Sequence, residues 1–171
     1  VLLMHFDHTS GENFTSGTVN NTVVDFSSTG SNGSTGTTGI VFNVTGGKFG
    51  GAFKFDGVND VLVIGSPSSH NLNGNMSIFA WMYYTTSGIL TIASQCSGAN
   101  IRQFDIEIGR TASRITSIWN GVLIDTSSTN LNTNTWYYVG FVRSGSTDSW
   151  TSEIYVNGNL DKRTTSIATN P

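Results

Sequence analysis

The sequence predicts an all-β protein, an antiparallel β-sandwich or barrel, and three features carry that prediction. Strand-like apolar runs recur about every ten residues, turn signals rich in Gly, Asn and Ser separate them, and no stripe has the helical period of about 3.6 residues. The predicted strands cover residues 1–6, 39–44, 52–55, 60–64, 76–84, 89–95, 103–108, 114–119, 121–125, 136–143 and 152–158.

The length and composition indicate one compact domain over residues 1–171 with a neutral, hydroxyl-rich surface. Charged residues make up 11% of the chain, the net charge is −3, and Ser, Thr and Asn fill roughly a third of it. Without a basic cluster, we expect no nucleic-acid partner, and no apolar run reaches the ~18 residues of a membrane span. The single cysteine, Cys96, excludes an internal disulfide, and we expect it in the core.

Two stretches near the N-terminus need separate interpretation. Residues 9–38 are rich in Gly, Ser, Thr and Asn, with "TVVDF" as the one strand candidate, and are predicted to form a long surface excursion. The stretch "GGKFGGAFKFDGVND" (46–60) has the glycines of a phosphate loop but no helix after it. We therefore interpret it as strand, turn, strand, with glycines that serve tight turns and close backbone approach.

Four motifs in register resemble the laminin G-like domains of the concanavalin A-like superfamily. They are "GGKFGGAFKFDGVNDVLVI", "NMSIFAWMYY", "NTNTWYYVGFVRSG" and "SEIYVNGNL", and the start "LLMHFDHTSGENFTSG" is similar to versions found in bacteriophage and other microbial surface proteins. The resemblance covers nearly the whole chain and implies two stacked antiparallel sheets, a jelly-roll β-sandwich. It leaves function open, because the fold hosts lectins, adhesion modules, glycanases and capsid or fibre decorations.

The hypothesis of an enzymatic function rests on the stretch "RQFDIEIG". Glucanases of the superfamily place Glu, Asp and Glu at alternating positions of one strand, where this chain has Gln103, Asp105 and Glu107. The amide of Gln103 occupies the nucleophile position. We therefore assign no catalytic residues and expect an ordinary strand with Phe104 inward and the polar residues outward.

A carbohydrate-binding function is implied by the resemblance, because lectin sites set aromatic faces against sugars. The candidates are Trp119, before an "NG" turn, and Trp150, in a polar hairpin. Trp81 and Trp136 match family positions that pack in or beside the core. The alternative for each candidate tryptophan is that it shields a hydrophobic edge.

Calcium is a cofactor that the family sometimes uses, and the turn "DGVND" offers Asp56, Asn59 and Asp60 as oxygen ligands. The same residues are standard turn formers, which explains them without an ion. Sequons occur at several asparagines, of which Asn13, Asn20 and Asn32 are the best glycosylation candidates, although this composition produces about as many sequons by chance.

We therefore expect a non-enzymatic adhesion or assembly module, extracellular or on a cell or virion surface, with a carbohydrate-binding module and a degenerate glycanase-like domain as alternatives. Family members usually finish with a further strand that pairs with the first, and this chain stops at "TTSIATNP". We expect Val1–Phe6 to pair with a neighbouring subunit or with a C-terminal segment that this chain lacks, because an apolar edge strand invites association. The alternative is that "TTSIAT" pairs with it.

Overall fold

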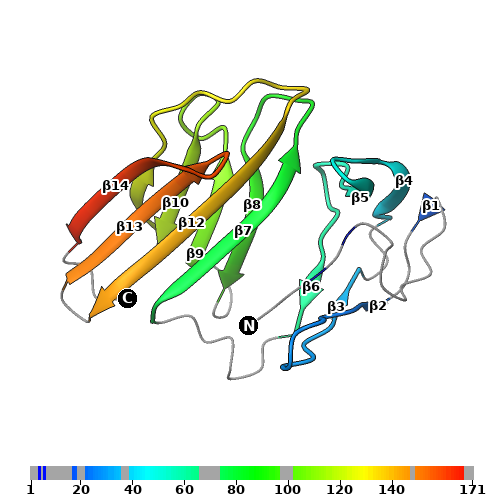
Figure 1. The fold of residues 1–171 in the computed structure, drawn as a ribbon, viewed down its shortest axis with the longest axis horizontal. Coiled ribbons are helices and arrows are strands. Elements are labelled where there is room, and N and C mark those ends of the chain that lie inside the picture. The colour runs from blue at the N-terminus through cyan, green and yellow to red at the C-terminus, as the bar shows by residue number, and fades with distance from the viewer. Residues whose placement is uncertain are drawn as a thin grey trace. The chain divides into compact units, whose positions relative to one another are not determined.

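The computed structural model describes residues 4, 6, 17–18, 22–35, 39–65, 74–96, 102–146 and 149–167. Over these residues the fold is all-β with antiparallel sheets, as the sequence predicts (Figure 1). The chain divides into two compact units, Val1–Asn71 and Leu72–Pro171, each with its own sheets. The sequence predicts one domain over residues 1–171. Whether the two units pack into one domain stays a prediction.

The larger unit contains two four-stranded antiparallel sheets. The first, called the β7 sheet, has the order β14-β13-β12-β7, and the second, called the β9 sheet, has the order β11-β10-β9-β8 (Figure 1). Their strands are β7 (Met76–Tyr83), β8 (Leu90–Cys96), β9 (Arg102–Ile108), β10 (Ile115–Trp119), β11 (Val122–Thr126), β12 (Trp136–Ser146), β13 (Ser149–Val156) and β14 (Asn159–Ile167).

One hydrophobic core joins these two sheets, which gives the unit the layers of a β-sandwich. The β9 sheet supplies Ile106, Ile108 and Ile115, and the β7 sheet supplies Phe141 and Ile154, all of them buried. Because side chains alternate along a strand, the other residues of these strands point away from this core.

Two Asn-Gly pairs form the tight turns that the sequence predicts. Asn120 and Gly121 connect β10 to β11 with φ angles of 46° and 76°, and Asn157 and Gly158 connect β13 to β14 with 52° and 81°. Positive φ at both central residues is the signature of a type I′ hairpin turn, whose twist matches that of the flanking strands.

The smaller unit contains two three-stranded antiparallel sheets, of order β1-β4-β5 and β2-β3-β6. Their strands are β1 (Gly17–Thr18), β2 (Thr22–Val23), β3 (Gly33–Ser34), β4 (Val41–Gly47), β5 (Gly50–Lys54) and β6 (Val63–Ile64). Val23 and Phe42 are fully buried at the centre of this unit.

The glycine-rich stretch 46–60 forms the β4–β5 hairpin and the turn after it, as predicted. Gly50 has a φ of 91°, and a Cβ at Gly51 would lie 2.3 Å from the ring of Phe42. The glycines therefore allow a tight turn and close approach of an aromatic ring, and no helix follows within the described part of the stretch.

Several details differ from the sequence-based expectations. Strands β1, β3 and β14 were not predicted, and Cys96 is exposed instead of buried in the core. Within 9–38, Val23 contributes to a core, so this segment is more than a surface excursion.

Of the predicted edge strand 1–6, only Met4 and Phe6 are described. Met4 forms an isolated antiparallel bridge with Asp25, and Phe6 packs against Phe53 with ring centroids 5.0 Å apart. The pairing of residues 1–6 with a strand from a neighbouring subunit, or from a C-terminal segment that this chain lacks, stays a prediction. Within the described ranges, no helix has the length and apolar character to cross a membrane.

Candidate functional site

The outer face of the β7 sheet carries exposed aromatic side chains. Every second residue of β7, beginning with the buried Met76, points toward the core. The residues between them point the opposite way, and Phe79, Trp81 and Tyr83 are 45%, 42% and 43% exposed. Three large rings on one strand therefore face outward from a packed sheet.

Rings from the neighbouring strands extend this row into a surface. Tyr138 lies 5.7 Å from Phe79 and 5.4 Å from Trp81, measured between ring centroids, and Trp136 lies 5.4 Å from Tyr83. We call the surface the aromatic face, and it consists of Phe79, Trp81, Tyr83, Trp136, Tyr138 and Tyr155.

Gly140 gives the aromatic face its close packing. It is the register partner of both Phe79 on β7 and Tyr155 on β13, and the centroids of those two rings are 6.0 Å apart. A Cβ at Gly140 would lie 2.1 Å from a carbon of the Phe79 ring, so any larger residue would displace the ring.

Polar groups border the aromatic face on the β13 and β14 side. The hydroxyl of Tyr155 donates a hydrogen bond of 2.8 Å to Glu153 Oε2, and Arg163 Nε donates one of 2.6 Å to Glu153 Oε1. The Tyr155 hydroxyl, followed by Arg163, lowers the pKa of Glu153, and the same hydrogen bond to Glu153 raises the pKa of Tyr155. A carboxylate, a guanidinium and a phenol are thus held together beside the rings.

The structure reverses the expected placement of the four tryptophans. Trp81 and Trp136, expected in or beside the core, belong to the outward aromatic face. Trp119 and Trp150, the predicted sugar-contacting residues, lie inside the unit and are 3% and 5% exposed. Their position leaves no open ring face for a sugar to stack on in this conformation.

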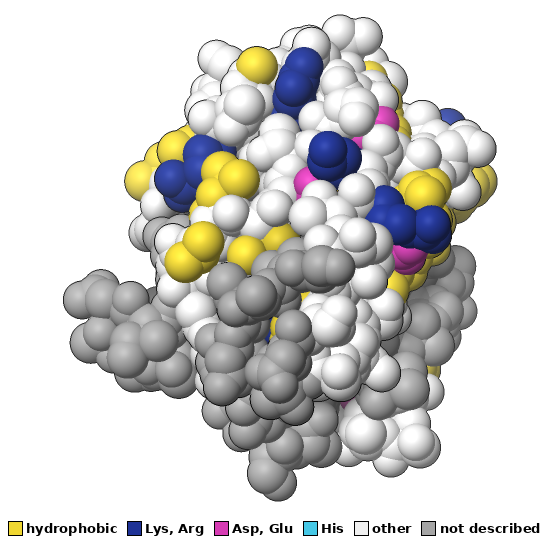
Figure 2. Space-filling model, turned by 90° about the vertical axis from the view of Figure 1, so that its left-hand side faces the viewer, with side chains coloured by type: hydrophobic (Ala, Val, Ile, Leu, Met, Phe, Trp, Pro, Cys, Tyr) yellow, Lys and Arg dark blue, Asp and Glu magenta, His cyan; other side chains and the backbone are white. Residues whose placement is uncertain are grey.

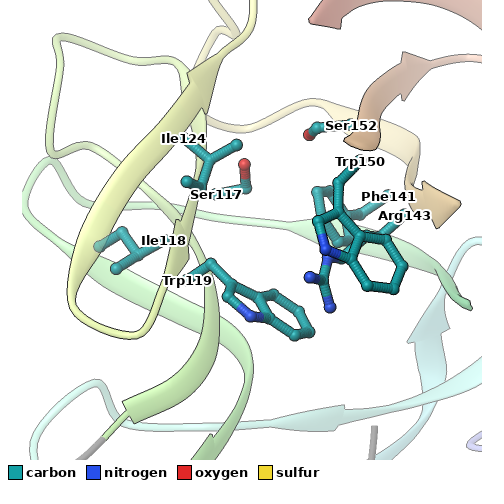
Figure 3. A pocket seen from close by; sticks show the side chains of 8 residues that line it. All are labelled: Ser117, Ile118, Trp119, Ile124, Phe141, Arg143, Trp150 and Ser152. Atoms are coloured by element: carbon teal, nitrogen blue, oxygen red, sulfur yellow. The ribbon is translucent and has the colours of Figure 1, made fainter. Parts of the chain in front are cut away.

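Trp119 and Trp150 instead enclose Arg143 of β12. The guanidinium carbon of Arg143 lies 3.7 Å from the ring centroid of Trp119 and 3.5 Å from that of Trp150, which is cation–π geometry on both sides (Figure 3). These residues line a cavity between the two sheets together with Ser117, Ile118, Ile124, Phe141 and Ser152. The cavity has space for about one water molecule.

A buried carboxyl group, that of Asp125, follows Ile124 of the cavity lining. Asp125 on β11 is the register partner of Ser117, and burial raises the pKa of its carboxyl. The backbone amide of Thr126 donates to Asp125 Oδ1 at 3.0 Å, which offsets part of that shift. The hydroxyls of Thr164 and Ser152 lie close enough to lower the pKa further, although Oδ2 has no hydrogen bond of normal length.

The two carboxylates of β9, Asp105 and Glu107, are buried. Phe104 points inward as expected, but Asp105 and Glu107 are buried on the opposite face, where we expected polar residues facing solvent. Glu107 is paired with Arg110, whose Nη2 donates to Oε2 at 3.2 Å and whose Nε donates to Oε1. Glu107, which aligns with the general acid of the glucanases, is therefore already paired with Arg110. Neither Asp105 nor Glu107 is among the residues that line the cavity.

The predicted calcium turn is held together by hydrogen bonds to its own backbone. Asp56 Oδ1 accepts hydrogen bonds from the amides of Val58, Asn59 and Asp60, which lower the pKa of Asp56, and Asp60 Oδ2 accepts one of 2.8 Å from the amide of Asp56. Asp60 Oδ1 is buried and has no hydrogen-bond partner. Calcium binding by this turn stays a prediction, and within the described ranges no group of three or more His, Cys, Asp or Glu residues could hold a metal ion.

Of the glycosylation candidates, Asn32 lies within the described ranges and Asn13 and Asn20 lie outside them. Asn32 is exposed, but its Oδ1 accepts a hydrogen bond of 2.9 Å from the amide of Asp25. Its side chain is therefore already used to hold the loop that follows β2.

Charge is sparse where the surface is visible in Figure 2. Lys and Arg side chains are separated from one another there, and most of the remaining described surface is uncharged. This agrees with the 11% charged composition. In comparisons with known families, curated proteins and solved structures, the chain matched none.

Proposed function

We propose that the protein is a non-enzymatic adhesion module, extracellular or on a cell or virion surface, that binds carbohydrate through the aromatic face. The observation that carries this proposal is the set of closely packed rings on the outer side of the β7 sheet, three of which are almost half exposed. Monomeric proteins seldom expose apolar surface of this kind without a binding function.

The chemistry of the aromatic face suits a sugar better than a lipid or a nucleic acid. Ring faces pack against the apolar side of a pyranose, and groups such as Glu153, Arg163 and Tyr155 supply hydrogen bonds to its hydroxyls. The rings are shared among β7, β12 and β13, so the surface suits several units of an extended glycan chain. The laminin G-like, jelly-roll assignment is consistent with this proposal and remains part of it.

Affinity electrophoresis against a panel of soluble polysaccharides, followed by a glycan array, tests the proposal. Trp81→Ala and Tyr138→Ala should each weaken binding of any glycan that the wild type retains by about tenfold or more, because each removes a stacking ring. Phe55→Ala is the matched control, since Phe55 is an exposed aromatic residue of the smaller unit. No binding by the wild type, or equal loss in all three variants, would reject the proposal.

Assembly with other protein subunits is a second candidate, favoured by the smaller unit. Phe49 and Val58 are 67% and 85% exposed there, more than any large hydrophobic residue described in the larger unit. Light scattering of the wild type and of a Phe49→Ser, Val58→Ser variant tests it, with an oligomer that the double substitution dissociates as the expected result.

A further inference from the structure

Arg143 is a buried cation for which the described residues supply no counter-charge. Its side chain is 4% exposed, and neither Nη1 nor Nη2 has a hydrogen-bond partner. Among the described residues, Glu107 is paired with Arg110 and Glu153 with Arg163, and neither pair includes Arg143. An indole ring covers each face of the guanidinium (Figure 3). A ligand can therefore contact the guanidinium only through the N–H groups at its edge.

The two indole rings do not replace a counter-ion. Burial lowers the pKa of Arg143 to about 10, so the side chain remains charged at neutral pH. Moving such a charge out of water costs more free energy than cation–π contacts with two rings return. Unpaired guanidinium N–H groups add the cost of buried donors without acceptors.

Other polar groups around Arg143 can also donate a hydrogen bond and have no acceptor. Nε1 of Trp119 and Nε1 of Trp150 are buried and have no hydrogen-bond partner, and the same holds for the hydroxyl of Ser117. An indole N–H can only donate, and a hydroxyl can donate as well. The set therefore favours an acceptor that carries negative charge.

Size decides which anion fits. The cavity that these residues line is partly open and has space for about one water molecule, so it favours an anion of one or a few atoms over a sugar acid or a phosphate ester. We infer that Arg143, with the indole N–H groups of Trp119 and Trp150, binds a monatomic anion of about the size of chloride between the two sheets. The anion adds the missing counter-charge and links the β7 sheet to the β9 sheet.

Thermal unfolding in sodium chloride and in sodium gluconate at equal ionic strength tests this inference. Gluconate is too large for the cavity, so it controls for screening. Above the dissociation constant, each tenfold increase in chloride should raise the melting temperature by about 3–5 °C for a chain of this size, and gluconate should not. Equal melting temperatures in the two salts would mean that the cavity holds water or nothing, and would overturn the inference.

Two variants and one direct measurement complete the test. Arg143→Met keeps the length of the side chain without its charge and should lose the chloride dependence. Arg163→Met should keep it, because Arg163 lies on the surface in an ion pair with Glu153. If Arg143→Met does not fold, crystals of the wild type grown in sodium bromide decide: an anomalous peak at the Nη atoms of Arg143 supports the site, and its absence rejects it.

Discussion

Gly140 shows how one missing side chain shapes a surface. The ring of Phe79 occupies the space that a Cβ at position 140 would need, and it belongs to the aromatic face. Because Phe79 is 45% exposed, the ring has solvent beside it into which it can move. A change at Gly140 therefore acts on the aromatic face more than on the core.

We expect Gly140→Ala to weaken glycan binding by about tenfold while changing the free energy of unfolding by about 1 kcal/mol or less. Affinity electrophoresis and urea denaturation measure the two effects separately. Gly74→Ala is the control, because a Cβ at Gly74 would meet no atom within 4 Å. Unchanged binding in Gly140→Ala would show that the position of Phe79 does not matter for the ligand.

Asp125 allows a prediction about pH. Burial raises its pKa in the folded protein above the ordinary value of 3.8. The protonated form is therefore favoured by folding, so this contribution to stability is present below the unfolded pKa and is lost as pH rises through the folded pKa.

Asp125→Asn cannot ionise and keeps an oxygen for the amide of Thr126. Its stability relative to the wild type should therefore increase as pH rises from about 3 to 7. Urea denaturation across this range measures the difference, and the two proteins should be closest at the acid end. A relative stability that falls with rising pH would contradict the expected direction of the shift.

At the scale of the element, the β13–β14 hairpin depends on its turn. Gly158 has a φ of 81°, which costs a residue with a Cβ roughly 1 kcal/mol, and Asn157 Oδ1 accepts a hydrogen bond of 3.1 Å from the amide of Tyr138. The turn thus connects three adjacent strands of the β7 sheet.

Gly158→Ala should lower the free energy of unfolding by about 1 kcal/mol through strain alone, since no atom lies within 4 Å of the added Cβ. Chemical denaturation measures the loss. Gly65→Ala should be close to neutral, because it has equal space and no positive φ. Equal stability of the two variants would show that the turn relaxes at no cost.

The strands were largely predictable from the sequence, but the face that each one buries was not. In "MSIFAWMYY" both sets of alternating residues are apolar, so a period of two separates Met76 from Phe79 without saying which is inside. Packing decides this, and Trp81 was expected in or beside the core although its side chain lies on the outer face. Strand β14 was missed because "NLDKRTTSI" is polar at an edge, where pairing with β13 replaces burial.

At the scale of the whole molecule, the two units have separate cores. Every member of the larger core lies within Leu72–Pro171, and every member of the smaller core lies within Val1–Asn71. The larger unit also has two complete four-stranded sheets. It contains what an independent folding unit requires.

We therefore expect residues 72–171, expressed alone, to unfold cooperatively and to retain the glycan binding of the full chain. Circular dichroism during heating and the same affinity electrophoresis check both parts, with the full chain as the reference. A shortened protein that aggregates or melts without a cooperative transition would show that the smaller unit is needed for folding.

The pairing of Trp119 with Trp150 across Arg143 has an optical consequence. One indole belongs to the β9 sheet and the other to the β7 sheet, and both contact the same guanidinium. Two indoles held this close should couple electronically and give a far-ultraviolet circular dichroism couplet that neither gives alone. Because the couplet requires both sheets to be in place, it should disappear when they separate even if each sheet keeps its own hydrogen bonds. The protein thus carries an intrinsic spectroscopic probe that distinguishes an opened sandwich from an unfolded chain.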